Sequence, residues 1–273
     1  MTKTRVIAAL IMAPAAIAAI LLLPTNWLAA AAAVVFLIGL WEWLRLAGID
    51  GLPRTFLLTL NLLLMVLLVW ADAGNAALYP LTALIGVAGW VLALAWLRFP
   101  QAGSSNSSPG RMGKLLAASW AVIPAWAALV LLHMQPDNGP LWLLTALATV
   151  WAADSGAYFA GRALGKHKLA PTISPNKTWE GLVGGVIAGI VVAVGFGLLA
   201  GIGASQLPGL MAVALFTTLF SVAGDLIESL LKRQAGAKDS GSLIPGHGGV
   251  LDRIDGVLAA LPVFVIGKEI AGF

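Results

Sequence analysis

The chain is organised around the stretch from Ser229 to Asp255, which reads Ser-Leu-Leu-Lys-Arg-Gln-Ala-Gly-Ala-Lys-Asp-Ser-Gly-Ser-Leu-Ile-Pro-Gly-His-Gly-Gly-Val-Leu-Asp-Arg-Ile-Asp. Ionisable side chains crowd around its glycines: Lys232, Arg233, Lys238, Asp239, His247, Asp252, Arg253 and Asp255. Charged residues make up only 10% of the whole chain, so this concentration indicates a site and not a solvated surface. Cations that can hold phosphate lie here beside carboxylates that can hold a metal.

Composition places the rest of the chain in a membrane. Of its 273 residues 60% are hydrophobic, and the charged fraction is far below the roughly 25% of a soluble domain. Cysteine is absent, which excludes disulfides, thiol catalysis and thiolate metal sites. The first apolar run resembles a secretory signal, but it is longer than the roughly 7–15 apolar residues of such a signal. We therefore keep it as a membrane span.

Apolar runs of about 20 residues, the length that crosses a bilayer, recur along the whole sequence. We predict an all-α integral membrane protein, a polytopic helical bundle with about nine transmembrane helices, near 5–23, 27–46, 55–71, 77–97, 115–134, 141–161, 181–203, 209–231 and 250–268. All of 1–273 is expected to form one membrane domain. Residues 1–134 supply N-terminal spans, and 135–273 supply catalytic spans with connectors at 162–180 and 232–249.

The basic residues predict the orientation. If the N-terminus is cytoplasmic, nine spans place every Lys and Arg except Lys268 on the cytoplasmic side, while the opposite connectors carry Asp72 and Asp137. Such a division follows the positive-inside rule. It predicts a multi-pass protein of the cytoplasmic (inner) membrane with its C-terminus outside and its site on the cytoplasmic side.

The eighth predicted span carries acids on one face. Asp225 and Glu228 are three residues apart and Lys232 continues the same face one turn later. Asp225 should lie about 10 Å inside the cytoplasmic end of its helix. A carboxylate at that depth is costly, so it should face protein, water or a metal. The plain alternative is an Asp–Lys pair between helices.

A second acidic pair, Asp252 and Asp255, begins the last span with the same spacing. The preceding Gly246-His247-Gly248-Gly249 can expose backbone N–H groups at a helix N-terminus, a favoured place for phosphate. Acids there can also be simple capping residues. Carboxylates from two helices suit Mg²⁺, which uses one or two carboxylates together with substrate phosphates. His247 could ligate metal, donate to phosphate or act as a base, and its glycine neighbours favour the phosphate role.

A further polar region follows the sixth span. Asp154 lies within that span, and Ser174-Pro175-Asn176-Lys177-Thr178 precedes the seventh. Hydroxyl, amide and ammonium groups just before a helix are suited to an anion site. For Ser174 a helix cap is an equally good reading, whereas for Lys177 we favour substrate phosphate.

These residues resemble a known family. Ser229 to Asp255 is similar throughout to the signature of the phosphatidate cytidylyltransferases (CDP-diacylglycerol synthases): Ser, then Lys-Arg, Lys-Asp, His-Gly-Gly and Asp-Arg-x-Asp. Asp154-Ser-Gly-Ala-Tyr158 and Ser174 to Thr178 resemble the family's other recurring segments. The likeness is detailed over about the last 130 residues.

The resemblance implies a membrane enzyme of phospholipid biosynthesis that makes CDP-diacylglycerol and pyrophosphate from CTP and phosphatidic acid. It further implies Mg²⁺ with the option of a second cation, a homodimer, and no nucleic-acid partner. The implied metal ligands are Asp225, Asp252 and Asp255, which with Lys232 and His247 form the expected catalytic set. The expected substrate-binding residues are Lys177, Asn176, Thr178, Ser174, Asp154, Arg233, Lys238, Asp239, Gly248, Gly249, Arg253 and Glu228.

Three other functions would share part of this sequence pattern. Asp252-Arg-Ile-Asp255-Gly256 imitates the opening of the CDP-alcohol phosphotransferase motif, but no further aspartate follows Asp255, which excludes that family. A related lipid or polyprenol kinase would share the membrane site and the nucleotide but should not release pyrophosphate. An anion transporter could use Asp225 as an ion relay, but it has no reason to consume CTP.

Overall fold

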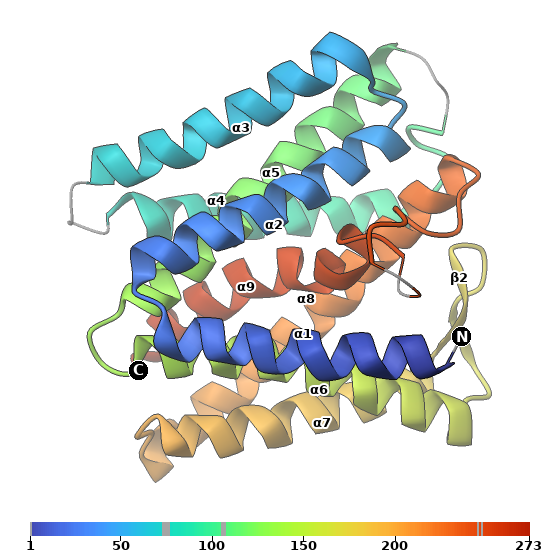
Figure 1. The fold of residues 1–273 in the computed structure, drawn as a ribbon. Coiled ribbons are helices and arrows are strands. Elements are labelled where there is room, and N and C mark those ends of the chain that lie inside the picture. Colours follow the sequence, from blue (N-terminus) through green and yellow to red (C-terminus); the bar gives the residue numbers. More distant parts are fainter. Residues whose placement is uncertain (1, 73–76, 105–107, 245, 247) are drawn as a thin grey trace.

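The computed structural model describes residues 2–72, 77–104, 108–244, 246 and 248–273, with the backbone alone for 2–9 and 108–109. Nine α-helices lie within these ranges (Figure 1): α1 Thr2–Leu22, α2 Thr25–Leu46, α3 Gly51–Asp72, α4 Leu78–Arg98, α5 Ser108–Met134, α6 Gly139–Leu164, α7 Trp179–Leu199, α8 Leu207–Gln234 and α9 Leu251–Ala271. One 3₁₀ turn, Ala204–Gln206, precedes α8. The predicted helical membrane fold is confirmed. Six helices (α2, α3, α4, α5, α7 and α8) are long and apolar enough to cross a bilayer.

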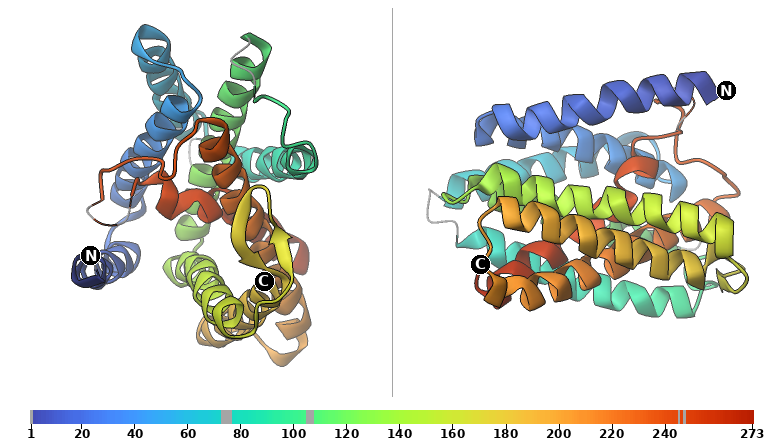
Figure 2. Two further views of the ribbon diagram at one scale, coloured as in Figure 1. Left: turned by 90° about the vertical axis from the view of Figure 1, so that its right-hand side faces the viewer. Right: turned by 90° about the horizontal axis from the view of Figure 1, so that it is seen from below.

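The helices run side by side along one direction, with α8 and α9 between the α2–α5 layer and the α6–α7 pair (Figures 1 and 2). Burial follows this arrangement. Inside the bundle, 67% of the apolar window of α5 is buried, against 17% for α3 on the outside. Helices whose apolar side chains remain exposed have the composition of lipid-facing elements.

Small residues bring α6 and α7 together. Glycine and alanine recur every fourth residue on the buried face of α7, at Gly181, Gly185, Gly189, Ala193 and Gly197. A Cβ on Gly185 would lie 2.8 Å from the Ala153 carbonyl oxygen of α6, so only glycine permits this approach. Close backbone contact through small residues is a usual way for membrane helices to associate.

A short hairpin joins α6 to α7. Strands β1 (Lys168–Ala170) and β2 (Ser174–Thr178) pair antiparallel, with Lys168 opposite Thr178 and Ala170 opposite Ser174. Thr178 then caps α7, its hydroxyl accepting from Gly181 N at 3.1 Å. The Glu180 carboxylate accepts from the backbone N–H groups of Lys166 and His167, which fixes the entry to the hairpin on the first turn of α7. The hairpin is therefore held where it meets the membrane helices.

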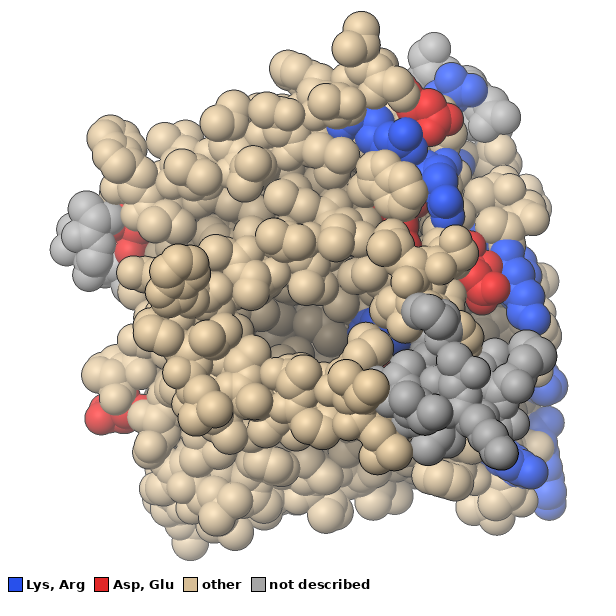
Figure 3. All heavy atoms as spheres, in the orientation of Figure 1, with Lys and Arg blue, Asp and Glu red and all other residues tan. Residues whose placement is uncertain are grey.

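Basic side chains gather at one end of the bundle. In Figure 3 the Lys and Arg side chains on the visible face lie at the end that Figure 1 shows to hold β2 and the α8–α9 loop, and the long sides between the ends are almost free of charge. An uncharged band between polar ends is what a bilayer requires. The described part of the α8–α9 loop and the hairpin thus share the basic end.

Candidate active site

A cavity of about 470 Å³ opens at the basic end, between α6, the hairpin, α8 and the start of α9. Its size is typical of a small-molecule site. Its lining is largely polar and comprises Asp154, Ala157, Tyr158, Leu169, Asn176, Lys177, Thr178, Gly181, Leu182, Val222, Asp225, Lys232, Asp239, Asp252, Arg253 and Asp255. The two regions singled out in the sequence, some 50–70 residues apart, therefore meet in one cavity.

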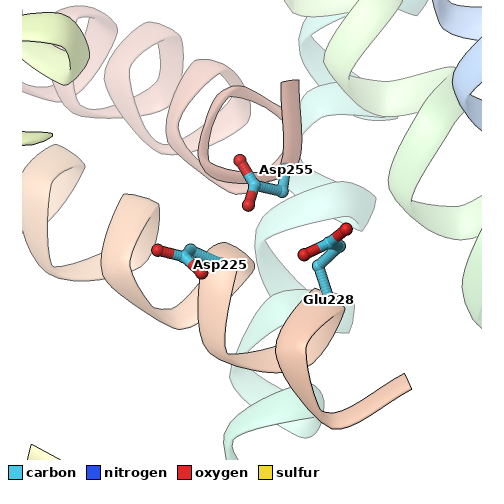
Figure 4. A group of neighbouring side chains, drawn as sticks. All are labelled: Asp225, Glu228 and Asp255. Atoms are coloured by element: carbon cyan, nitrogen blue, oxygen red, sulfur yellow. The ribbon is translucent and has the colours of Figure 1, made fainter. Parts of the chain in front are cut away.

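Three carboxylates converge beside this cavity. Asp225 and Glu228 project from one face of α8 toward Asp255 on α9, as Figure 4 shows. One oxygen from each lies within 4.8 Å of the others. Gly224 lets the helices approach this closely, because a Cβ there would overlap the Asp255 carbonyl oxygen and lie 3.2 Å from Ala259 Cβ. The face of α8 that carries Asp225 and Glu228 therefore lies against one acidic residue of α9, Asp255.

Two lysines balance this negative charge. Lys177 reaches in from β2, with its Nζ 2.6 Å from Asp225 Oδ2 and 3.5 Å from the Val222 carbonyl oxygen. Lys232 on α8 pairs with the buried Glu228 and, at 2.7 Å, with Asp252 Oδ1. Partners of opposite sign are what a charge needs where water is scarce. The cavity therefore joins a carboxylate cluster to two ammonium groups that come from different elements.

Asp252 holds the α8–α9 loop onto the first turn of α9. Its Oδ2 accepts from Ser240 N at 3.0 Å, Ser240 Oγ at 2.9 Å and Gly249 N at 2.7 Å. Its Oδ1 accepts from Lys232. Oδ2 is thus fully engaged, since a carboxylate oxygen offers about two lone pairs. The structure joins Asp252 to the acidic cluster through Lys232, and its metal-ligand role stays a prediction.

Several expected substrate-binding residues line the cavity, namely Asp154, Asn176, Thr178, Asp239 and Arg253. Five other expected residues do not line it: Ser174, Arg233, Lys238, Gly248 and Gly249. Arg233 donates to the Ile173 carbonyl oxygen at 3.3 Å and so ties the hairpin to α8. Gly248 has φ +85, and a side chain there would crowd Asp252. His247 lies outside the described residues.

Two residues that the sequence reading passed over are built into the loop. Glu42 on α2 is fully buried and accepts from Ser240 Oγ at 3.0 Å and from Leu251 N at 2.7 Å. Ser240 is itself fully buried. The sequence does mark Glu42, because it is the one acidic residue in the apolar run Thr25–Leu46. An acidic side chain within a membrane span is costly and is usually functional.

The acidic cluster has the chemistry of a site for a hard divalent cation. Its donors are all carboxylate oxygens, which Mg²⁺ prefers. Among the described residues, no N–H or O–H group donates a hydrogen bond to the buried Glu228 Oε1. A buried carboxylate oxygen without a donor is unfavourable, and a cation bound among the three carboxylates would satisfy it. The residues present therefore fit a divalent cation such as Mg²⁺, which Asp225, Glu228 and Asp255 would hold.

Comparison with known proteins shows which family the whole chain resembles. A model of the Cytidylyltransferase family matches residues 3–270. The phosphatidate cytidylyltransferase of Haemophilus influenzae is 38% identical over 280 aligned positions that cover 97% of each chain. That of Pseudomonas aeruginosa is 40% identical over 282 positions, covering 100% of this chain and 99% of its own. That of Bacillus subtilis is 48% identical over 128 positions, or 45% of this chain and 46% of its own.

The matches extend beyond the signature to both halves of the bundle, so the resemblance read from the sequence is confirmed. The chain therefore belongs to the cytidylyltransferase family and is a multi-pass membrane nucleotidyltransferase.

Proposed function

We propose that this nucleotidyltransferase transfers the cytidylyl group of CTP to phosphatidic acid in the cavity between the hairpin, α8 and α9. The relatives that match it from end to end are phosphatidate cytidylyltransferases. The observation that carries the assignment to this cavity is the meeting of three carboxylates and two lysines at the basic end of the bundle. Two phosphate-bearing substrates need that combination of charges.

The reaction makes modest demands on the protein. A phosphate oxygen of phosphatidic acid attacks the α-phosphorus of CTP and forms a new P–O bond. The bond from the α-phosphorus to the bridging oxygen breaks, and its electron pair leaves with pyrophosphate. The attacking phosphate is already ionised at neutral pH, so no strong base is needed. Catalysis then consists mainly of holding two anions in line and stabilising charge on the triphosphate.

The lysines and the hairpin are placed for that task. Lys177 and Lys232 line the cavity, and their ammonium groups can bind triphosphate or lipid phosphate as point charges. Asn176 and Thr178 lie beside Lys177 on the same strand. Asp225, Glu228 and Asp255 would hold Mg²⁺, which when bound supplies positive charge to the triphosphate.

The position of the cavity suits one substrate from water and one from the bilayer. It opens at the charged end of the bundle, while the apolar sides of the helices face lipid. We assign this end to the cytoplasmic face of the inner membrane, with the N-terminus cytoplasmic, because the basic residues gather there. CTP then enters from the cytoplasm, and the acyl chains of phosphatidic acid stay in the bilayer. We retain the homodimer implied by the resemblance as part of this proposal.

The position of the label in the product tests the reaction. Purified protein is given phosphatidic acid, Mg²⁺ and CTP labelled at either the α- or the γ-phosphate. Cytidylyl transfer predicts α-label in the lipid, γ-label in pyrophosphate, and no turnover after chelation of the metal. γ-label in the lipid would show a lipid kinase instead. If label appeared neither in the lipid nor in pyrophosphate, the protein would lack cytidylyltransferase activity, and the transporter hypothesis would be favoured.

A further inference from the structure

We infer that Glu42, on the second helix, is a positioning residue that sets the place of the Asp255 carboxylate from outside the family's signature stretch. Its side chain is 0% exposed, although it lies more than 180 residues from any member of the acidic cluster. The inference rests on the proposed metal site and adds to it a part of the molecule that the sequence pattern did not connect with catalysis.

Helix α9 begins without a cap of its own. Its N-cap residue is Val250, whose side chain has no oxygen, and no side chain at that position accepts from the first turn. The N–H groups of a first helical turn need acceptors from elsewhere. Glu42 Oε2 supplies one by accepting from Leu251 N at 2.7 Å. A carboxylate at a helix N-terminus also interacts favourably with the helix dipole. One acceptor of the α9 cap thus comes from α2, and a second comes from the loop, where Ser240 Oγ accepts from Asp252 N at 3.3 Å.

The same oxygen of Glu42 also fixes the loop that leads into α9. Ser240 Oγ lies 3.0 Å from Glu42 Oε2 and 2.9 Å from Asp252 Oδ2, so its single proton lies between two carboxylates. One turn further along α2, Arg45 donates to the Ser240 carbonyl oxygen. Ser240 is therefore held from both sides, by α2 and by the first turn of α9.

The packing around Glu42 leaves no room for adjustment. A Cβ on Gly241 or Gly249 would overlap the Glu42 carboxylate, so the loop backbone lies directly against it. One turn earlier on α2, a Cβ on Gly39 would lie 2.7 Å from Ile254 Cδ1 of α9. Residues 39 and 42 share one face of α2. This face therefore fixes both the height and the lateral position of the first turn of α9, and Asp255 follows on the next turn.

From Glu42 the contacts lead directly to the acidic cluster. Asp252 pairs with Lys232, and Lys232 pairs with Glu228. Asp255 begins the turn that follows the one capped by Glu42, one residue after Ile254. Displacing the start of α9 would thus move the Asp255 carboxylate. It would also break the Asp252–Lys232 pair, and Lys232 is the partner of Glu228. Residues that orient metal ligands in this indirect way typically change metal affinity or activity by about 10- to 100-fold when lost.

Two conservative variants separate position from charge. Glu42→Gln removes the charge but keeps an oxygen that can accept from Leu251 N and Ser240 Oγ. Glu42→Asp keeps the charge but withdraws the carboxylate by one methylene. A positioning role predicts near-parental behaviour for Glu42→Gln. For Glu42→Asp it predicts about 10-fold or greater weakening of Mn²⁺ binding and a comparable loss of turnover.

The experiment measures Mn²⁺ affinity by paramagnetic resonance titration, turnover per folded molecule, and deuterium uptake by peptides covering 240–252. Mn²⁺ binding and deuterium uptake report on Glu42 even if the cytidylyl-transfer assay fails. Asn61→Ala is the matched control. Asn61 is equally buried and bonds Leu57 O and Ser119 Oγ, away from the cavity. This control should lower stability and leave Mn²⁺ affinity unchanged.

The expected result is weaker Mn²⁺ binding and faster deuterium uptake at 240–252 in Glu42→Asp, with both restored in Glu42→Gln. Parental Mn²⁺ affinity and turnover in Glu42→Asp would overturn the inference, whatever the effect on stability. So would the reverse pattern, with Glu42→Gln impaired and Glu42→Asp normal, because Glu42 would then act through its charge.

Discussion

The carboxylates of the acidic cluster repel one another and are stabilised by neighbouring lysines. At about 5 Å and an effective dielectric constant of about 20, two carboxylates repel by about 3 kcal/mol. The cluster tolerates three because Lys177 and Lys232 bind its two α8 members. Among the described residues, Asp255 forms no salt bridge, and its Oδ1 accepts a hydrogen bond from Gly256 N at 2.7 Å. A divalent cation would relieve the repulsion that remains.

Glu228 and Asp252 should differ when each loses its charge. Glu228 belongs to the cluster, whereas Asp252 accepts hydrogen bonds from the loop and from Lys232. We therefore expect Glu228→Gln to raise the Mg²⁺ concentration for half-maximal rate by about 10- to 100-fold. Asp252→Asn should mainly lower the maximal rate and increase deuterium uptake in the loop.

Mg²⁺ titrations of the two variants, at saturating CTP and phosphatidic acid, make this comparison. A rise in Mg²⁺ requirement for Asp252→Asn, with none for Glu228→Gln, would restore the ligand set that the family resemblance implies. The same result would show that Glu228 is not a metal ligand.

At the scale of helices, the contact between α8 and α9 positions the cluster. Gly224 is the point of closest approach, since a Cβ there would overlap the Asp255 carbonyl oxygen. Overpacking of a tight contact costs about 1–3 kcal/mol and displaces one element. Here the displaced element carries Asp255. The geometry of the site and the stability of the bundle therefore depend on the same glycine.

Gly224→Ala should lower both the thermal midpoint and the activity. Gly195→Ala on α7 is its control, because a Cβ there meets nothing within 4 Å. In that helix interior alanine is expected to be neutral or to stabilise by about 0.5–1 kcal/mol. Thermal unfolding in detergent and turnover per folded molecule provide the readout. Parental turnover in Gly224→Ala would show that the α8–α9 contact does not set the site.

Hydropathy and breakers were enough to predict the helices but not every boundary. The seventh span was expected to run to residue 203, whereas α7 ends at Leu199. The chain stays apolar through Ile202, so hydropathy cannot mark the end, which is made by Gly201 at φ +96. Within 162–180 the sequence predicts a connector with an anion site at Ser174–Thr178, but not the two strands of the hairpin. Strands of three and five residues are too short for a periodic signal.

Spacing predicted which acids share a helix face, but not which acids meet across helices. Asp225 and Glu228 were grouped correctly on one face of α8, and Asp252 and Asp255 were expected to act as a second pair. In the structure only Asp255 joins the cluster. Residue 252 lies one turn nearer the helix start, where loop N–H groups compete for its oxygens. Such competition depends on how the loop folds, which spacing does not encode.

For the whole molecule, the distribution of charge predicts how it crosses the membrane. The chain has no cysteine, so single cysteines can be introduced without background. Gln101→Cys, between α4 and α5, should react with a membrane-impermeant maleimide only from the cytoplasmic side. Asp137→Cys, between α5 and α6, should react only from outside. Both positions are exposed. The opposite labelling would invert the orientation and place the cavity on the wrong side for CTP.

The central claim is that carboxylates from α8 and α9 hold one divalent ion at which the nucleotide binds. Its most direct test is paramagnetic resonance of Mn²⁺ added to the purified protein together with CTP. The account predicts a bound Mn²⁺ with coupling to CTP phosphorus, lost in the triple variant Asp225→Asn, Glu228→Gln, Asp255→Asn while the protein remains folded. Mn²⁺ that stays bound to that variant, with the phosphorus coupling intact, would contradict the account.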